Sequence, residues 1–177
     1  MSVISTTTNT VTATISGFVS PFGGISITPD NSKAYVTNYG GNSVSMIDAI
    51  TNTITSVISV GSLPSSSAIT PDGTLLYVVN RASNNVSVIN TATNTVITTI
   101  AVGTNPDQGC SMSPDGTKFY VTNYADNTVS VINTATNTVA ATITGFSGPA
   151  GVSFISDGSL AYICNTNSNS VTVVNTS

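Results

Sequence analysis

The chain of 177 residues is long enough to form one domain with its own core, yet only 6% of its residues are charged and the formal net charge is −4. Three basic residues are too few for the positive surface that nucleic acids or anionic lipids require, and no apolar stretch approaches the ~20 residues of a membrane helix, so we expect neither nucleic-acid binding nor membrane insertion. The sequence has no histidine, which removes the usual general base and metal ligand, so we expect no metal and no cofactor.

The first elements of the chain are two short segments, Ser2 to Ser5 and Val11 to Ile15, in which apolar and polar residues alternate. Alternation that is rich in Val, Ile and Thr is typical of β-strands. Met1 to Val11 is a weaker copy of a segment that occurs twice without change, at Val86 to Val96 and at Val129 to Val139. Internal repetition therefore organises this chain.

Two further markers recur once in each repeat. The first is an aspartate in a turn that resembles Pro-Asp-Gly, at spacings of 42, 43 and 42 residues: Asp30, Asp72, Asp115 and Asp157. The second is a tetrad that resembles Tyr-Val-Thr-Asn and follows the aspartate closely, beginning at Tyr35, Tyr77, Tyr120 and Tyr162. The repeats therefore span approximately 1–42, 43–85, 86–128 and 129–170, with 171–177 as a partial repeat.

The third complete unit shows the elements that we expect in every repeat. Strands are predicted at 109–113, 118–123, 128–133 and 138–144, and we name them a, b, c and d in chain order. We expect a tight turn around Asp115 to join strands a and b. Proline presets φ, aspartate accepts backbone hydrogen bonds, and glycine lets the backbone leave the turn without steric strain. No 3.6-residue apolar stripe interrupts the strands. Each unit is therefore a four-stranded antiparallel meander.

One such sheet cannot bury both of its faces, whereas sheets stacked around an axis cover one another. The sequence therefore predicts an all-β fold: a β-propeller of four-stranded antiparallel blades, with about four blades of about 42 residues in a single half-ring domain over 1–177. The chain starts with a c–d pair and stops after strands a, b and c. We expect a head-to-tail homodimer to complete eight blades; the alternatives are a closed four-bladed monomer, and a polymer or a fragment of a longer chain.

The tetrad at Tyr120, the Ser-Pro-Asp-Gly turn before it and the stretch Val129 to Val139 after it resemble the YVTN family of β-propeller repeats. The resemblance covers essentially the whole chain. It implies a surface-layer or secreted protein, so we expect an extracellular or cell-surface location, although the N-terminus shows no signal peptide. The blade also resembles those of phosphogluconolactonase-like and nitrite-reductase-like propellers, so the fold alone does not decide the activity.

Residues that repeat in every unit are expected to be structural. The turn aspartates should bond to their own backbone rather than bind calcium, and the tetrad tyrosines should pack between sheets. We expect Cys110 and Cys164 to be free, buried thiols.

Residues that break the repeat are candidates for a ligand site. Propeller ligands usually bind on the face formed by the loops between strands d and a and between strands b and c. Exposed aromatic rings beside amides and carboxylates on that face suit a sugar or a peptide. These candidates are Phe22, Tyr39, Arg81, Asp107, Gln108, Tyr124 and Asp126.

Catalysis is not expected. Asp107 and Asp126 form the only candidate carboxylate pair for glycosidase-like work, and Arg81 alone gives too little positive charge for a lactonase-like site. The sequence therefore favours a non-catalytic surface or secreted module for adhesion, scaffolding or self-assembly. The alternative is a receptor module that binds a carbohydrate or a peptide, and a lactonase-like enzyme ranks third. The expected partners are a second copy of the chain and a glycan or cell-surface protein.

Overall fold

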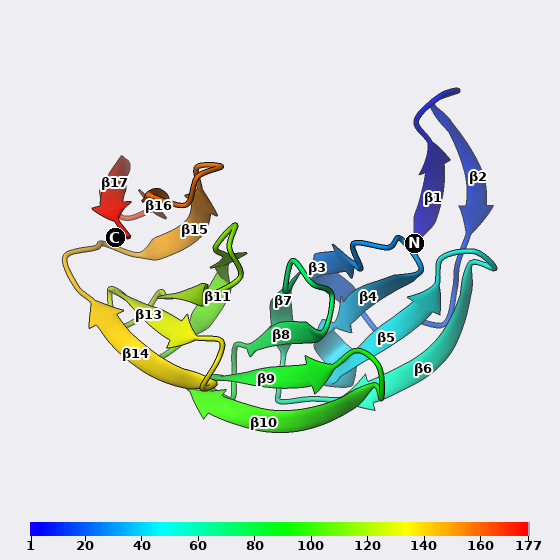
Figure 1. Ribbon diagram of the computed structural model, residues 1–177, viewed down its shortest axis with the longest axis horizontal. Coiled ribbons are helices and arrows are strands. Elements are labelled where there is room, and N and C mark those ends of the chain that lie inside the picture. Colours follow the sequence, from blue (N-terminus) through cyan, green and yellow to red (C-terminus); the bar gives the residue numbers. More distant parts are fainter. Residues whose placement is uncertain (177) are drawn as a thin grey trace.

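The computed structural model describes residues 1–176, apart from the side chain of Gln108, and shows an arc of small antiparallel sheets (Figure 1). We call β1 and β2 the N-terminal hairpin and the later sheets blades 1 to 4. The hairpin contains β1 (Ser2–Ser5) and β2 (Thr10–Thr14). Blade 1 contains β3 (Pro21–Ile27), β4 (Lys33–Asn38), β5 (Ser43–Asp48) and β6 (Thr53–Ser59), with the 3₁₀ turn η1 (Tyr39–Gly41). Blade 2 contains β7 (Pro64–Ile69), β8 (Leu75–Asn80), β9 (Asn85–Asn90) and β10 (Thr95–Ala101). Blade 3 contains β11 (Pro106–Met112), β12 (Lys118–Asn123), β13 (Thr128–Asn133) and β14 (Thr138–Ile143). Blade 4 contains β15 (Pro149–Phe154), β16 (Leu160–Asn165) and β17 (Ser170–Asn175).

Each complete blade is a four-stranded meander in sequence order, whereas blade 4 has three strands and the hairpin has two. The predicted all-β propeller architecture is confirmed. Strand a of each blade lies on the inner side of the arc and strand d lies on the outer side (Figure 1). Along residues 1–176 we find no helix long and apolar enough to cross a membrane.

Strand a of blade 3 begins earlier than predicted. The sequence placed its start at residue 109, but β11 begins at Pro106, which pairs with Asn123. An irregularity separates this pair from the regular ladder that starts at Cys110. Because the register is irregular here, the first residues of the strand do not follow the two-residue alternation on which the prediction rests. Asp107 therefore lies in an inner strand rather than in a loop.

The turn between strands a and b has the predicted structural role. In blade 3, Asp115 Oδ1 accepts hydrogen bonds from the Thr117 N–H at 3.0 Å and from the Ser113 hydroxyl at 2.6 Å. The corresponding N–H two residues onward donates to the turn aspartate in every repeat: Asp30, Asp72, Asp115 and Asp157. The carboxylates thus hold the turns in shape.

Consecutive blades pack face to face, and we call the two contacting surfaces the front face of one blade and the back face of the next. Between blades 2 and 3, Tyr77, Val86 and Val88 of the front face pack with Phe119 and Val121 of the back face. The rings of Tyr77 and Phe119 have centroids 5.0 Å apart. Equivalent clusters join blade 1 to blade 2 and blade 3 to blade 4. The core is therefore divided among the spaces between blades.

Two predictions of burial are wrong at the end of the arc. Tyr162 is 43% exposed and Cys164 is also exposed, because within residues 1–176 no further blade lies against the front face of blade 4. Both cysteines are free, as expected. Cys110 packs against the cluster between blades 2 and 3, and burial raises the pKa of its thiol to about 11.

The inner strands approach one another closely near the axis. A Cβ added to Gly109 in β11 would lie 1.6 Å from the carbonyl oxygen of Ala150 in β15 and 2.1 Å from Thr122 Oγ1. The same hydroxyl lies 3.0 Å from the Gly109 carbonyl oxygen and 3.1 Å from that of Ala150. This contact fixes the relative positions of the inner strands that carry the side chains of the inner surface.

Candidate functional site

A hollow of about 700 Å³ opens on the inner side of the arc, where blades 2, 3 and 4 converge. The residues that line it are Arg81, Asp107, Tyr124, Ala150, Gly151 and Thr166. Three of these, Arg81, Tyr124 and Thr166, directly follow the asparagine that ends strand b in successive blades. Stacking of blades around an axis therefore brings together residues that are about 42 positions apart in the sequence.

The asparagine that ends strand b fixes the start of the following loop. In blade 2, the side-chain amide of Asn80 donates hydrogen bonds to Asn85 Oδ1 and to Ser87 Oγ, both at 2.8 Å. In blade 3, Asn123 makes the equivalent bonds to Thr128 at 3.0 Å and Ser130 at 2.9 Å. The loop residues that come next, which line the hollow, thus extend from rigid strand ends.

Arg81 is held by two neighbouring blades. Its Nε donates a hydrogen bond to Asn105 Oδ1 at 2.7 Å, and its Nη1 lies 3.4 Å from the hydroxyl of Tyr39. The guanidinium therefore spans the inner surface from blade 1 to the loop that enters blade 3. This arrangement presents a positioned cation with further N–H groups at the wall of the hollow.

Asp107 supplies the negative charge of the same hollow. Its Oδ1 atom is buried, and in the described part of the chain this atom has no hydrogen-bond partner. A buried carboxylate oxygen without a donor is costly, so a ligand hydroxyl there would be favourable. Tyr124 adds an aromatic ring, and its hydroxyl lies 3.1 Å from Asn167 Oδ1. The hollow thus combines a cation, an anion and a ring.

The structure brings Arg81, Asp107 and Tyr124 of the predicted site residues together. Tyr39 reaches this group through Arg81, and Phe22 packs edge-on against Tyr39 with ring centroids 5.3 Å apart, beside the hollow rather than in its wall. Asp126 does not line the hollow. Its Oδ2 instead accepts a hydrogen bond from the Thr104 N–H at 2.6 Å, which holds the loop before blade 3.

The side chain of Gln108 lies outside the described residues. Sequence reasoning missed Thr166, which lines the hollow, although its repeat position matches those of Arg81 and Tyr124 and could have indicated it.

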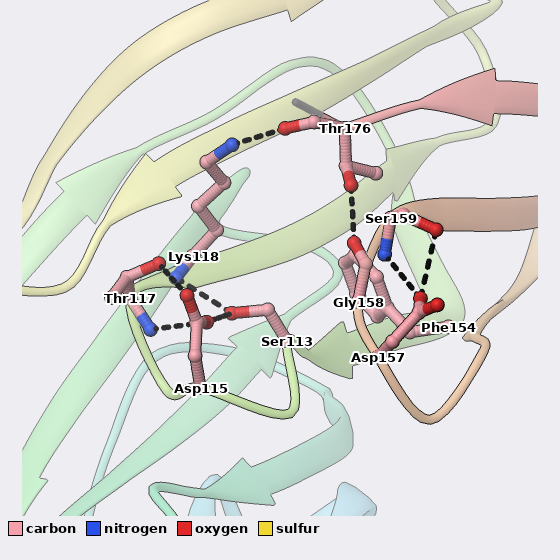
Figure 2. Close-up of a pocket in the computed structure, with 9 residues that line it drawn as sticks. All are labelled: Ser113, Asp115, Thr117, Lys118, Phe154, Asp157, Gly158, Ser159 and Thr176. Carbon is pink, nitrogen blue, oxygen red and sulfur yellow. Dashed lines mark hydrogen bonds between the residues drawn. The ribbon is translucent and has the colours of Figure 1, made fainter.

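A second hollow, of about 300 Å³, lies between the a–b turns of blades 3 and 4 (Figure 2). Its aspartates, Asp115 and Asp157, bond to their own turns, and its lysine, Lys118, donates to the carbonyl oxygen of Thr176 (Figure 2). Blades 1 and 2 repeat this arrangement, with Lys33 Nζ 2.6 Å from the carbonyl oxygen of Thr91. Recurrence and internal bonding mark it as a structural feature of the blade contact.

Over residues 1–176, His, Cys, Asp and Glu side chains form no group of three or more that could hold a metal ion. Residues 1–101 match the family described as "Lactonase, 7-bladed beta-propeller". No curated protein shows significant similarity to the chain.

Two solved structures resemble the chain. A structure titled "Kuenenia stuttgartiensis Hydrazine Synthase" is 32% identical, with a TM-score of 0.84 over 93% of this chain and 48% of the other. A functionally unknown protein from Desulfotomaculum acetoxidans DSM 771 is 21% identical, with a TM-score of 0.77 over 94% of this chain and 58% of the other. The second likeness shows the fold alone. The chain thus spans about half of the length of the structures that it matches.

Proposed function

The chain belongs to the family described as "Lactonase, 7-bladed beta-propeller", and on this basis we propose that its inner hollow binds a sugar acid or the corresponding lactone. The observation that carries the proposal is the convergence of Arg81, Asp107 and Tyr124 in one hollow. The three side chains come from blades 2 and 3, and no other repeat combines an arginine and an aspartate at the positions of Arg81 and Asp107.

Each of the three side chains suits one part of such a ligand. The guanidinium of Arg81 donates to a carboxylate or to a lactone carbonyl, and these charge-assisted bonds are stronger than neutral ones. The unpartnered Oδ1 of Asp107 accepts from a sugar hydroxyl. The ring of Tyr124 offers an apolar face for the C–H side of the sugar.

We propose binding without turnover for this chain. Hydrolysis of a lactone needs a base that activates water and donors that stabilise the oxyanion. The hollow has one carboxylate, and Arg81 already bonds to Asn105 and Tyr39. The family match nevertheless leans toward an enzyme-like propeller, so turnover must be measured. The comparisons give no support to adhesion, a surface-layer role or an extracellular location, which stay predictions from the sequence.

Calorimetric titration with D-gluconate and with its δ-lactone tests the proposal. Arg81→Ala should weaken gluconate binding at least about tenfold, which corresponds to about 1.4 kcal/mol. Arg81→Lys should rescue little of it, because an ammonium cannot reproduce the planar fork that reaches Asn105. Lys118→Ala, which removes a cation from the other hollow, is the matched control and should bind normally.

Absence of binding at millimolar ligand, or equal weakening by the control, would contradict the proposed site. Lactone hydrolysis is followed separately as acid release in weak buffer. A rate above the buffer rate that Asp107→Asn removes would show that the chain is an enzyme with Asp107 as its base.

A further inference from the structure

The side chain of Arg81 has two hydrogen-bond partners, and both are neutral. Its Nε donates to Asn105 Oδ1 at 2.7 Å, and its Nη1 lies 3.4 Å from the hydroxyl of Tyr39. Asp107 lines the same hollow but is not one of these partners, and its buried Oδ1 has no donor among the described residues. The positive charge of Arg81 is therefore not neutralised by the groups that hold the side chain.

The neutral partner at Nε determines which N–H groups of Arg81 stay available. A guanidinium has five N–H groups, and the bonds to Asn105 and Tyr39 use two of them, on Nε and Nη1. The three that remain include at least one on each terminal nitrogen. Such a pair can donate to both oxygens of a carboxylate, whereas an approach that needs Nε is blocked by Asn105. Arg81 is thus oriented for a carboxylate at its terminal nitrogens.

The main chain at Asn105 has a structural role that does not depend on its side chain. Its φ is 53°, its N–H donates to Asn84 Oδ1 at 2.9 Å, and its carbonyl oxygen accepts from the Tyr124 N–H at 3.2 Å. Three other residues at the same repeat position share the positive φ and accept the equivalent bond from the first residue after strand b: Ser20, Leu63 and Gly148. This backbone conformation therefore does not require an asparagine.

The side chain of Asn105 matches Arg81 specifically. Arginine and asparagine occur together at the contact between blades 2 and 3, where they bond to one another. The corresponding positions of the other two contacts hold a tyrosine and a residue without a side-chain acceptor: Tyr39 with Leu63, and Tyr124 with Gly148. The sequence thus departs from its repeat at both positions of a single contact, which points to a task for the pair.

We propose that Asn105 is a positioning residue that sets the charge preference of the inner hollow. Its neutral oxygen orients Arg81 without cancelling the positive charge, so the hollow selects an anionic sugar acid over an uncharged lactone or polyol. This inference rests on the ligand class proposed above. The carboxylate of the acid binds at the terminal nitrogens of Arg81, and a hydroxyl donates to Asp107. Because Arg81 is oriented before the ligand arrives, binding costs little side-chain entropy.

Nuclear magnetic resonance of the ligand-free chain tests the positioning directly. The chain contains one arginine, so the arginine Nε–H signal belongs to Arg81. Asn105→Gly should accelerate exchange of this proton with water at least about tenfold, because a hydrogen-bonded proton exchanges only when its bond opens. Gly148, with a φ of 61°, shows that glycine fits this backbone. Ser20→Gly makes the same change at the same repeat position and should leave the signal unchanged.

Calorimetric titration with D-gluconate and D-glucitol tests the charge preference, because the two ligands differ only in a carboxylate and an uncharged CH₂OH group. The wild type should bind gluconate at least about tenfold more tightly than glucitol. Asn105→Asp keeps the acceptor and its size but places a negative charge beside the guanidinium, and should reduce this preference to about twofold or less. Asn105→Gly should weaken gluconate binding by about three- to tenfold, and Ser20→Gly should bind normally.

The outcomes separate this inference from the proposed function. The site would stand but Asn105 would set no charge preference if the wild type bound gluconate and glucitol equally, or if Asn105→Asp kept the wild-type preference. If the wild type bound neither ligand, the proposed function and the charge preference would both fail, and the Nε–H exchange alone would decide whether Asn105 positions Arg81. Equal exchange in the wild type and Asn105→Gly overturns the positioning role whatever the ligand does.

Discussion

The hydroxyl of Tyr77 in blade 2 donates a hydrogen bond to Oδ1 of Asn137, which lies 2.6 Å away in the turn between strands c and d of blade 3. Asn137 adopts a left-handed backbone conformation with a φ of 54°, so this turn depends on an asparagine for its shape and offers its amide oxygen to the previous blade. One side chain thus links the packing between blades to the geometry of a turn.

Tyr77→Phe should lower the free energy of unfolding by about 1 kcal/mol, because the variant keeps the buried ring but leaves the Asn137 oxygen without its donor. Urea denaturation followed by circular dichroism measures the change. The matched control is Tyr162→Phe, since Tyr162 occupies the same repeat position but is 43% exposed. Equal effects of the two substitutions would show that the bond to Asn137 contributes nothing.

Gly109→Ala should destabilise the chain by about 3 kcal/mol or more, because the added Cβ would lie 1.6 Å from a carbonyl oxygen of the next blade. Gly151→Ala is the matched control at the same repeat position of blade 4. Its Cβ would meet only Cys164, with Sγ at 3.7 Å and Cβ at 4.0 Å, which are ordinary contacts. Thermal unfolding of both variants measures the difference, and similar melting temperatures would argue against the close approach of the inner strands.

Acid should destabilise the folded chain through its turn aspartates. Hydrogen bonds from Thr28 and Ser32 lower the pKa of Asp30 to about 2, and similar bonds lower the pKa of Asp72 and Asp115. Because these folded-state values lie below the unfolded value near 4, the stabilisation is present above about pH 4 and is lost as the pH falls toward about 2. Urea midpoints should therefore decline over this range, and the decline should be shallower in Asp72→Asn.

Alkali should act through the buried phenols. Burial, together with the charge of Asp72, raises the pKa of Tyr77 to about 12. A raised pKa means that the stabilisation is complete below the unfolded value near 10 and is lost as the pH rises toward about 12. The melting temperature should fall over this interval, and Tyr77→Phe should fall less steeply than the wild type. A parallel decline of both proteins would assign the effect to other groups.

The repeat predicted most of the fold because strand bounds are a local property. The predicted strands at 118–123 and 128–133 coincide with β12 and β13. Burial is not local, however: Tyr162 has the sequence context of Tyr77 but lacks the neighbouring blade that covers Tyr77. A repeat pattern assigns one environment to all copies, and it therefore fails at the ends of the arc.

The candidate site was predictable in part for the same reason. Arg81 and Asp107 stood out as charges in a chain with few charges, and Tyr124 stood out as an aromatic residue in a loop between strands b and c. Thr166 attracts no attention among many threonines, and only the convergence of blades shows that it belongs with them. The irregular start of β11 orients Asp107. It does not follow the two-residue alternation of a strand, so this pattern could not predict it.

Because each blade contacts mainly its immediate neighbours, the arc behaves as a one-dimensional array of coupled units. Amide hydrogen exchange should then reveal a gradient along the sequence: slowest in blades 2 and 3, which have neighbours on both sides, and faster in β17 and in the N-terminal hairpin, which lie at the two ends of the arc. An array of this kind frays from its ends inward, so closing the arc into a ring would slow exchange throughout the molecule by removing the ends from which opening starts.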